Sequence, residues 1–257
     1  MRIMGLSFKE KYSFGIGALG KDLCYAIVSS YLMIYFTDSI GLAPAFVGSL
    51  FLVARLWDAV NDPAMGMIVD NTKTKWGKFR PWILIGTLIN AVVLVFLFKR
   101  PAGLEGSSLY AYYSVMYILW GMTYTIMDIP YWSMIPTLAT TKEDREKISV
   151  VPRIFASLGG LTVTTFGIAL VNKLGNGNQI KGFEYFALGI VIIFIISTIV
   201  TCINVKEKTQ VQVNNEKVNI KQAFNILKQN DQLLVFIGIV LAYNLAMQLA
   251  GGAAIYY

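Results

Sequence analysis

The chain contains no histidine, only two cysteines and few charged residues, which make up 14% of its 257 positions. Without histidine, any proton relay must use carboxylates, hydroxyls or water. Both Cys24 and Cys202 lie in apolar stretches, so neither a disulfide framework nor a metal cluster is indicated. The first apolar stretch is long, is interrupted by Lys21 and Asp22, and lacks a small-residue cleavage site. A cleaved secretory signal is therefore not expected.

Hydrophobic residues are abundant instead, at 56% of the chain. This is far more apolar surface than one soluble core of this length needs, so we expect an integral membrane protein built only from helices. A spanning helix needs about 20 mostly apolar residues. Six such stretches and most of a seventh occur near residues 12–36, 44–69, 81–98, 109–137, 150–171, 183–203 and 232–257.

Basic residues are concentrated in alternate connections between these predicted helices. Fifteen lysines and arginines lie before the first helix and after the second, fourth and sixth, against four in the other connections. The net charge of +7 thus follows topology, and a nucleic-acid partner is not indicated. By the positive-inside rule, we expect a multi-pass protein of the cytoplasmic membrane with a cytoplasmic N-terminus. Short outer loops are then predicted near residues 37–43, 99–108 and 172–182.

The longest polar stretch divides the chain. Residues 204–231 carry charges, Asn and Gln without a sustained apolar run, which predicts a cytoplasmic middle loop with an amphipathic piece near 220–227. The loop separates a predicted six-helix bundle, residues 1–203, from residues 232–257, which begin a further helix. This is the plan of a transporter built from two similar halves. We expect the chain to be a fragment that holds the N-terminal half.

Charged residues recur inside the predicted second helix. Arg55, Asp58 and Asp62 are spaced three and four positions apart, with Asn61 beside them, so they share one helix face. A charged side chain at the centre of a membrane helix costs about 2.5–3.5 kcal/mol on insertion scales. This cost favours a functional role for the charged residues. Asp58 and Asp62 offer hard ligands to Na⁺ or Li⁺, and without an ion they favour a shared proton. The alternative is a salt-bridge cluster that only fixes helix packing.

The predicted fourth helix repeats this arrangement. Tyr124, Asp128 and Trp132 are spaced four positions apart, with Thr125 beside them, so they form a stripe. Aromatic faces next to a carboxylate suit a sugar, because a ring packs on its C–H face while the acid accepts hydrogen bonds from hydroxyls. Tyrosine and tryptophan alone are common in membrane helices, so the interpretation depends on Asp128.

Further charges lie in the first and fifth predicted helices. Lys21 and Asp22 are about 15 Å along the first helix, near its middle. Since adjacent side chains on a helix point in different directions, we expect one to face a cavity and the other to reach a neighbour. Arg153 begins the fifth helix. It either snorkels to the cytoplasmic interface or pairs with Asp22 or Asp128, and both interpretations stay open.

Prolines support some of the predicted helix ends. Pro44, Pro81 and Pro152 stand near the predicted first turns of helices, where a missing N–H costs nothing. Pro63 and Pro130 fall inside helices, and each deprives a carbonyl of its helical partner. Those carbonyls are either oxygen ligands beside the acids or marks of kinks that serve packing.

Three long strings carry a resemblance to a known family. They are FLVARLWDAVNDP at 51–63, WGKFRPW at 76–82 and ILWGMTYTIMDIPYW at 118–132. All three closely resemble the glycoside–pentoside–hexuronide:cation symporters of the major facilitator superfamily, the melibiose-carrier family. Shorter matches around Lys21, Arg153 and residues 230–244 extend the likeness over essentially the whole chain.

The resemblance implies roles for particular residues. It places the cation site at Asp58, Asn61, Asp62 and Thr125. It assigns the sugar to Lys21, Asp22, Tyr124, Asp128, Trp132 and Arg153. A gating and charge network is expected from Arg55, Asp70, Lys78 and Arg80.

The implied activity is secondary active transport by alternating access, with no cofactor other than a coupling ion. A galactoside such as melibiose would be carried with Na⁺, Li⁺ or H⁺, and the partners are this sugar, the monovalent cation and the lipid bilayer. Family members have twelve helices, and this sequence has no counterpart of the last five. The alternative is a non-transporting half that needs a C-terminal partner. A membrane enzyme is not expected, because no nucleophile–base arrangement occurs.

Overall fold

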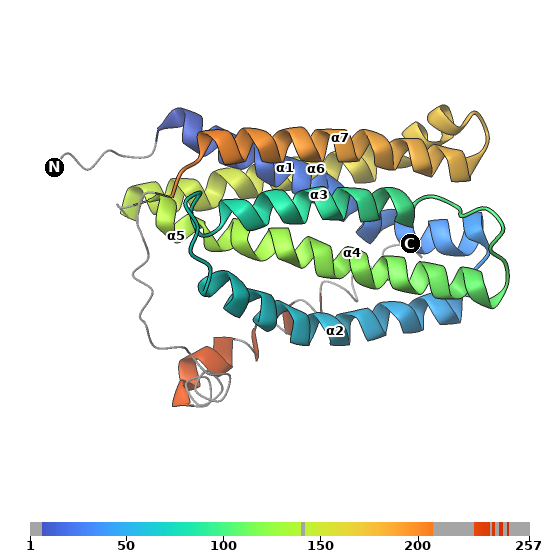
Figure 1. Cartoon of the computed structure of the whole chain (residues 1–257), viewed down its shortest axis with the longest axis horizontal. Coiled ribbons are helices and arrows are strands. Elements are labelled where there is room, and N and C mark those ends of the chain that lie inside the picture. Colours follow the sequence, from blue (N-terminus) through green and yellow to red (C-terminus); the bar gives the residue numbers. More distant parts are fainter. Residues whose placement is uncertain are drawn as a thin grey trace. The chain divides into compact units, whose positions relative to one another are not determined.

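The structure, a computed structural model, describes residues 7–139, 142–207, 229–236, 238–239, 242–243 and 246. Every regular element within these residues is a helix (Figure 1), which confirms the predicted all-helical class. The chain separates into two units, Met1–Val211 and Gln212–Tyr257. Most of the predicted middle loop, 204–231, and much of the predicted seventh helix, 232–257, lie outside the described residues, so both stay predictions.

The first unit is a bundle of long helices. In chain order they are α1 (Phe8–Ile34), continued by the π-helix η1 (Tyr35–Ile40), α2 (Pro44–Asp70), α3 (Arg80–Leu97), α4 (Ser107–Ser133), the short α5 (Ile135–Leu138), α6 (Lys142–Gly175) and α7 (Gln179–Asn204). Each of the six spans predicted before residue 204 overlaps one long helix of this described part.

Some predicted limits are wrong. The predicted outer loop 37–43 is mostly helical, because η1 continues α1 as far as Ile40, before Gly41 in a left-handed conformation. The helix α6 begins well before residue 150, so Pro152 lies in its interior and not in its first turn. Its early start is favoured by Glu143 and Asp144 in the first turn, since acidic side chains stabilise a helix N-terminus.

The predicted fourth helix, 109–137, is two helices. A turn at Met134 ends α4, and α5 follows with Pro136 in its first turn. Pro63 and Pro130 lie inside α2 and α4, as predicted, while Pro44 stands in the first turn of α2. Pro44 and Pro136 thus stand where a helix begins, at positions where the missing N–H costs nothing.

Close packing joins α1 to α6 and α7, α3 to α4 and α7, and α2 to α4. Glycines permit close approaches at two of these crossings. A Cβ atom on Gly159 of α6 would lie 2.8 Å from the carbonyl oxygen of Leu19 in α1, and one on Gly86 of α3 would lie 2.7 Å from the backbone nitrogen of Met127 in α4. Small residues at such crossings let membrane helices pack backbone to backbone.

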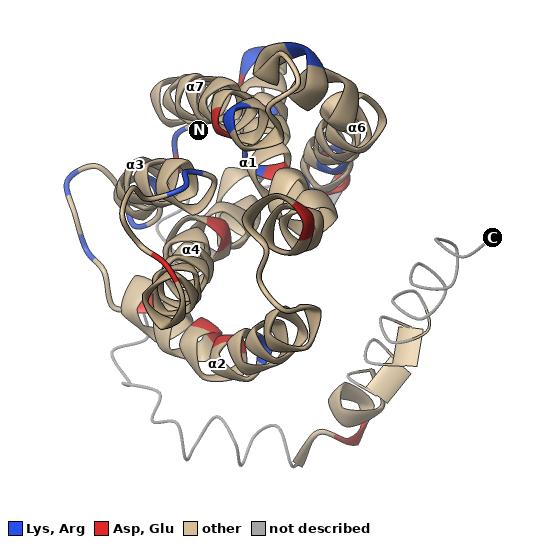
Figure 2. Cartoon of the chain, turned by 90° about the vertical axis from the view of Figure 1, so that its right-hand side faces the viewer, with Lys and Arg blue, Asp and Glu red and all other residues tan. Residues whose placement is uncertain are grey.

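Four helices of the described residues are long and apolar enough to cross a membrane: Phe8–Ile40, Arg80–Leu97, Glu143–Gly175 and Gln179–Asn204. The helices α2 and α4 have 27 residues each but are not among them. Acidic residues interrupt the ribbons of α2 and α4 when the bundle is viewed along its helices (Figure 2). The two long helices that are not among these four therefore carry most of the predicted site.

Candidate functional site

Lys21 is the centre of a buried charge cluster between α1 and α4. Only 3% of this residue is exposed. Its Nζ donates a hydrogen bond to Asp128 Oδ1 at 2.7 Å and to the Tyr124 hydroxyl at 3.5 Å, and it lies 3.1 Å from Asp22 Oδ2. A buried ammonium needs such partners to offset the loss of its hydration. These polar contacts bring together four of the six residues assigned to the sugar.

Aromatic rings enclose the same ammonium. Lys21 Nζ lies 4.7 Å from the ring centroid of Trp132, 5.6 Å from that of Tyr131 and 5.8 Å from that of Tyr124. The faces of such rings attract a cation. Tyr131 is absent from the predicted set, although it stands next to Trp132. Its ring stacks on Phe14 of α1 at 4.3 Å and its hydroxyl donates to the Phe14 carbonyl, so it also ties α4 to α1.

Lys21 is the member of this adjacent pair that reaches a neighbouring helix, through Asp128 of α4. The flexible stem of Lys21 carries its ammonium to the neighbouring carboxylate, 3.1 Å away. The contact is an ion pair without hydrogen-bond geometry, because Asp22 Oδ2 is buried and accepts no hydrogen bond. This oxygen is therefore a buried acceptor with unused hydrogen-bonding capacity.

Arg153 lies apart from the Lys21 cluster. It is exposed on α6 and forms no ion pair with any described residue, so of the two interpretations left open, the pairing with Asp22 or Asp128 is not found. Lys21 holds those two acids instead. Arg153 and Trp132 line one open depression of about 500 Å³ with Ala156 and Ser157. Two residues assigned to the sugar thus border the same accessible space.

A second charged group lies where α2 packs against α4. Arg55 Nη1 donates to Asp58 Oδ2 at 3.3 Å, and Thr125 Oγ1 donates to Asp62 Oδ1 at 3.0 Å. The side chains of Arg55 and Asp58 are 58% and 25% exposed. Asn61 Nδ2 is buried without a hydrogen-bond partner. The four residues assigned to the cation therefore lie at one helix contact, with Asp58 turned to Arg55 and Asp62 to Thr125.

The oxygen atoms of this group are suitable ligands for a monovalent cation. No cluster of three or more Asp, Glu, Cys or His side chains that could hold a metal ion occurs within the described residues. Asp58 and Asp62 supply two carboxylates, and Thr125 and Asn61 add neutral oxygens. Oxygen ligands of this kind are what Na⁺ and Li⁺ prefer.

Trp120 lies between the two charged groups and is absent from the predicted set. Together with Tyr117 it lines a small cleft beside Asp58. Its ring stacks on Tyr124 at a centroid distance of 5.4 Å and on Tyr117 at 6.2 Å. The spacing of Tyr117, Trp120 and Tyr124 along α4, three and four positions apart, is the signal that would have identified it.

A buried amide fixes the backbone of α4 at this point. Asn90 of α3 is fully buried, and its Nδ2 donates to the Trp120 carbonyl at 2.9 Å and to Thr123 Oγ1 at 2.8 Å. Cys24 Sγ donates to Asn90 Oδ1 at 3.2 Å. Because a buried polar group without partners is costly, this network holds α1, α3 and α4 in one arrangement behind Trp120.

The residues predicted to gate the protein separate into two places. Lys78 Nζ lies 2.7 Å from Asp70 Oδ1 at the end of α2, and Arg80 Nη1 donates to the Cys202 carbonyl at 3.5 Å. Arg55 belongs instead to the pair with Asp58. The loop between α2 and α3 therefore carries its own charge contacts, distinct from those of Arg55.

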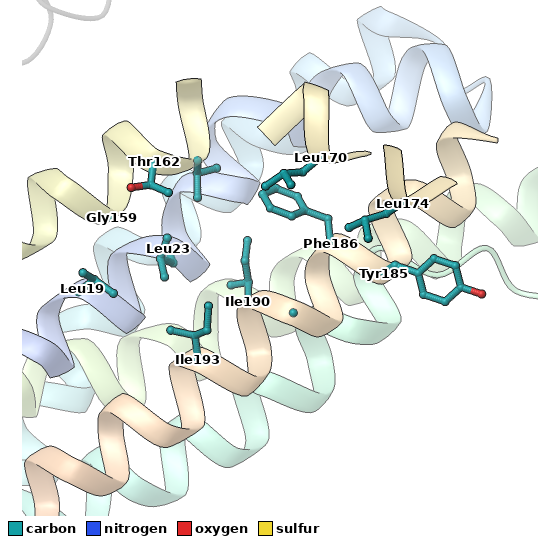
Figure 3. Close-up of a pocket in the computed structure, with 12 residues that line it drawn as sticks. Leu19, Leu23, Gly159, Thr162, Leu170, Leu174, Tyr185, Phe186, Ile190 and Ile193 are labelled. Atoms are coloured by element: carbon teal, nitrogen blue, oxygen red, sulfur yellow. The ribbon is translucent and has the colours of Figure 1, made fainter. Parts of the chain in front are cut away.

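A cavity of about 450 Å³ lies on another side of the bundle, between α1, α6 and α7 (Figure 3). Its lining is mostly aliphatic, with Leu23, Leu170 and Ile190 among the contributing side chains. No residue assigned to the sugar, the cation or gating lines it. It is separate from the candidate site.

Comparison with known proteins identifies the family of this chain. The chain matches a family described as "MFS/sugar transport protein" over residues 13–257. The chain belongs to this family. The MFS/sugar transport family is one of transporters and not of enzymes, so the chain is part of a multi-pass membrane protein.

Curated relatives agree along almost the whole chain. The inner membrane symporter YicJ of Escherichia coli (strain K12) is 32% identical over 98% of this chain and 54% of its own length. The isoprimeverose transporter of Lactiplantibacillus pentosus is 31% identical, over 97% and 52%. The lactose permease of Lactobacillus delbrueckii subsp. bulgaricus is 30% identical, over 96% and 42%. The chain thus spans about half the length of the curated relatives it matches, and the predicted symporter family is confirmed.

Proposed function

We propose that this chain forms one half of a cation-coupled sugar symporter that works by alternating access. The observation that carries the proposal is the buried Lys21 ammonium, held by Asp22 and Asp128 and enclosed by aromatic rings. Ionisable groups inside membrane helices mark a substrate or ion pathway by default. The names of the relatives, two sugar transporters and a symporter, support the same function.

The Lys21 cluster has the chemistry that a sugar requires. Carboxylate oxygens of Asp22 and Asp128 accept hydrogen bonds from hydroxyls, and charge-assisted bonds of this kind are strong. The face of Trp132 can pack against the C–H groups of a sugar ring, and it borders the open depression with Arg153. A sugar that enters there would meet the acids at the edge of the cluster.

The cation is assigned to Asp58, Asn61, Asp62 and Thr125. Tyr124 and Thr125 are neighbours in α4, and the first contacts Lys21 while the second contacts Asp62. A cation that draws Asp62 and Thr125 together would therefore also adjust Tyr124 and the sugar site. By linkage, the sugar must tighten cation binding by the same factor as the cation tightens sugar binding.

Substrate and orientation complete the proposal. We assign a galactoside such as melibiose as the sugar and Na⁺, Li⁺ or H⁺ as the coupling ion. The relatives' printed names include isoprimeverose and lactose, so relatives of similar identity are named for different sugars. The N-terminus and the α2–α3 loop are assigned to the cytoplasmic side, because basic residues are concentrated there.

Sugar uptake by the full-length gene product tests the proposal. Radiolabelled melibiose uptake is measured with and without Na⁺ for the unchanged protein, for Asp62→Cys and for Asp38→Asn, an exposed acid of η1. Asp62→Cys is expected to abolish stimulation by Na⁺, whereas Asp38→Asn is expected to retain it. Unchanged stimulation in Asp62→Cys would contradict the cation assignment.

The second candidate is a half that does not transport without a C-terminal partner. It is favoured by the share of the relatives that the chain covers, about half. Binding of the sugar by the 257-residue chain, alone and with a supplied C-terminal half, separates the two functions. Uptake when the two halves are supplied as separate chains would support this candidate, and uptake only when they are joined in one chain would contradict it.

A further inference from the structure

Glu207 lies just beyond α7, and its carboxylate binds the start of α3. The backbone nitrogen of Lys78 donates to Glu207 Oε2 at 2.9 Å, and that of Phe79 donates to Oε1 at 2.9 Å. Phe79 is the N-cap residue of α3 and supplies no capping side chain of its own. The Glu207 carboxylate therefore satisfies N–H groups at the positive end of this helix.

Gly77 permits this contact. Its φ of 106° is a left-handed conformation, which favours glycine, and an added Cβ atom would lie 2.8 Å from Glu207 Cδ. Thr74 Oγ1 donates to the Gly77 carbonyl at 2.6 Å, which holds the turn in place. A side chain at position 77 would push the carboxylate away from the two N–H groups.

The same loop reaches α2. Lys78, whose backbone binds Glu207, also places its ammonium 2.7 Å from Asp70 Oδ1 in the last turn of α2. Figure 1 shows the chain leaving α7 toward the loop that precedes α3. The ends of α2, α3 and α7 are thus joined through one short segment, Gly77 to Phe79.

We propose that Glu207 is a positioning residue that holds the α2–α3 loop on the end of α7 and so sets the rate of the transport cycle. The proposal deepens the proposed transport function and rests on it. Alternating access moves helices against one another as bodies. A contact that fixes three helix ends makes them move together, and its loss lets the loop open locally. The residues of this contact are not those that surround Lys21, so sugar affinity should change little.

Limited proteolysis tests the contact without reference to transport. Lys73 and Lys75 are exposed in the loop, and trypsin cleavage after them in the detergent-purified full-length gene product reports loop opening. Glu207→Ala and Gly77→Ala are each expected to speed this cleavage about 10-fold, because both break charge-assisted hydrogen bonds. The double variant is expected to be no faster than the faster single variant, since both changes remove one contact.

A matched glycine controls for backbone strain. Gly103 also has a left-handed φ, 74°, and no heavy atom lies within 4 Å of an added Cβ atom. Gly103→Ala is expected to leave cleavage after Lys73 and Lys75 unchanged. Equal acceleration by Gly103→Ala, normal cleavage in Glu207→Ala, or additive effects in the double variant would each overturn the proposal.

Uptake measurements then separate positioning from binding. Glu207→Ala is expected to lower the maximal uptake rate about 5-fold and to keep KM within about 2-fold, as for a residue that governs a conformational step. Glu207→Gln, which keeps one acceptor oxygen, is expected to be intermediate. A raised KM at an unchanged maximal rate would contradict the positioning role. Absence of uptake by the unchanged protein would refute the transport function, and the cleavage rates would still decide whether the contact exists.

Discussion

The two charged groups beside α4 differ in the exposure of their basic residue and in the number of its partners. Lys21 is 3% exposed and contacts two carboxylates and the faces of aromatic rings. The Arg55 side chain is 58% exposed and forms one pair, with Asp58. The acids are alike, because the side chains of Asp22, Asp128 and Asp58 are 25%, 28% and 25% exposed. The basic residue of the first group is held inside the fold, whereas that of the second is open to water. This difference suits the proposed roles, in which the sugar wall is prearranged and the cation site opens and closes.

Removal of the Lys21 ammonium should have the largest effect. Lys21→Met leaves Asp22 and Asp128 close together without a counter-charge, and breaking a buried pair costs about 3–5 kcal/mol of stability. The measurement is the free energy of unfolding of the detergent-purified full-length gene product. A loss below about 1 kcal/mol, the range of exposed pairs, would erase the contrast between the two groups.

Asp128→Asn should act next most strongly, on sugar binding. It removes the charged acceptor at 2.7 Å from Lys21 Nζ, and we expect the Kd for melibiose to rise about 30- to 100-fold, as charge-assisted bonds imply. Equilibrium binding at saturating Na⁺ measures the change. Asp38→Asn serves as the exposed control, and equal values for the two variants would refute the assignment.

Thr125→Val should have a smaller effect, on the cation. It removes the hydrogen bond to Asp62 Oδ1, and Na⁺ affinity is expected to fall about 10-fold, a typical cost of one lost bond to a charged group. The concentration of Na⁺ that half-stimulates uptake gives the change. Thr162 is an exposed threonine of α6, and Thr162→Val should leave that concentration unchanged. An unchanged concentration in Thr125→Val would contradict the role of Thr125 in the cation site.

Arg55→Met should have the smallest effect on stability. The pair with Asp58 is partly exposed, and such pairs contribute about 0–1 kcal/mol. Unfolding of this variant beside Lys21→Met compares the two groups directly. A cost as large as that of Lys21→Met would show that the Arg55 pair is structural, which is the salt-bridge alternative considered from the sequence.

Hydropathy and proline placement predicted where the long helices lie, but they predicted less well the residues at which those helices begin and end. The apolar windows give each span, but the early start of α6 lies in charged residues that stabilise a helix through Glu143 and Asp144. The π-helix η1 depends on a backbone hydrogen-bond pattern that no residue type specifies. Glu207 falls in a polar stretch that predicts a loop. Its contact with the turn at Gly77 is seen only in the structure.

Helical spacing predicted only the part of the candidate site that lies within a single helix. It placed Tyr124, Asp128 and Trp132 on one face of α4, and the structure finds all three around Lys21. It did not pair Lys21 with Asp128, which is 107 positions away, because periodicity within one helix carries no information on its neighbour. Tyr131 was missed because its contacts come from α1. Arg153 was open between two interpretations for lack of the same information.

The reciprocity of cation and sugar binding tests the central claim most directly. Melibiose Kd is measured by calorimetry on the full-length gene product with and without saturating Na⁺, and Na⁺ Kd with and without saturating melibiose. The account predicts that each ligand tightens the other by one common factor, of about 5- to 150-fold, and that Asp62→Asn removes this coupling while weak melibiose binding persists. Melibiose affinity that is independent of Na⁺, or coupling that survives in Asp62→Asn, would contradict it.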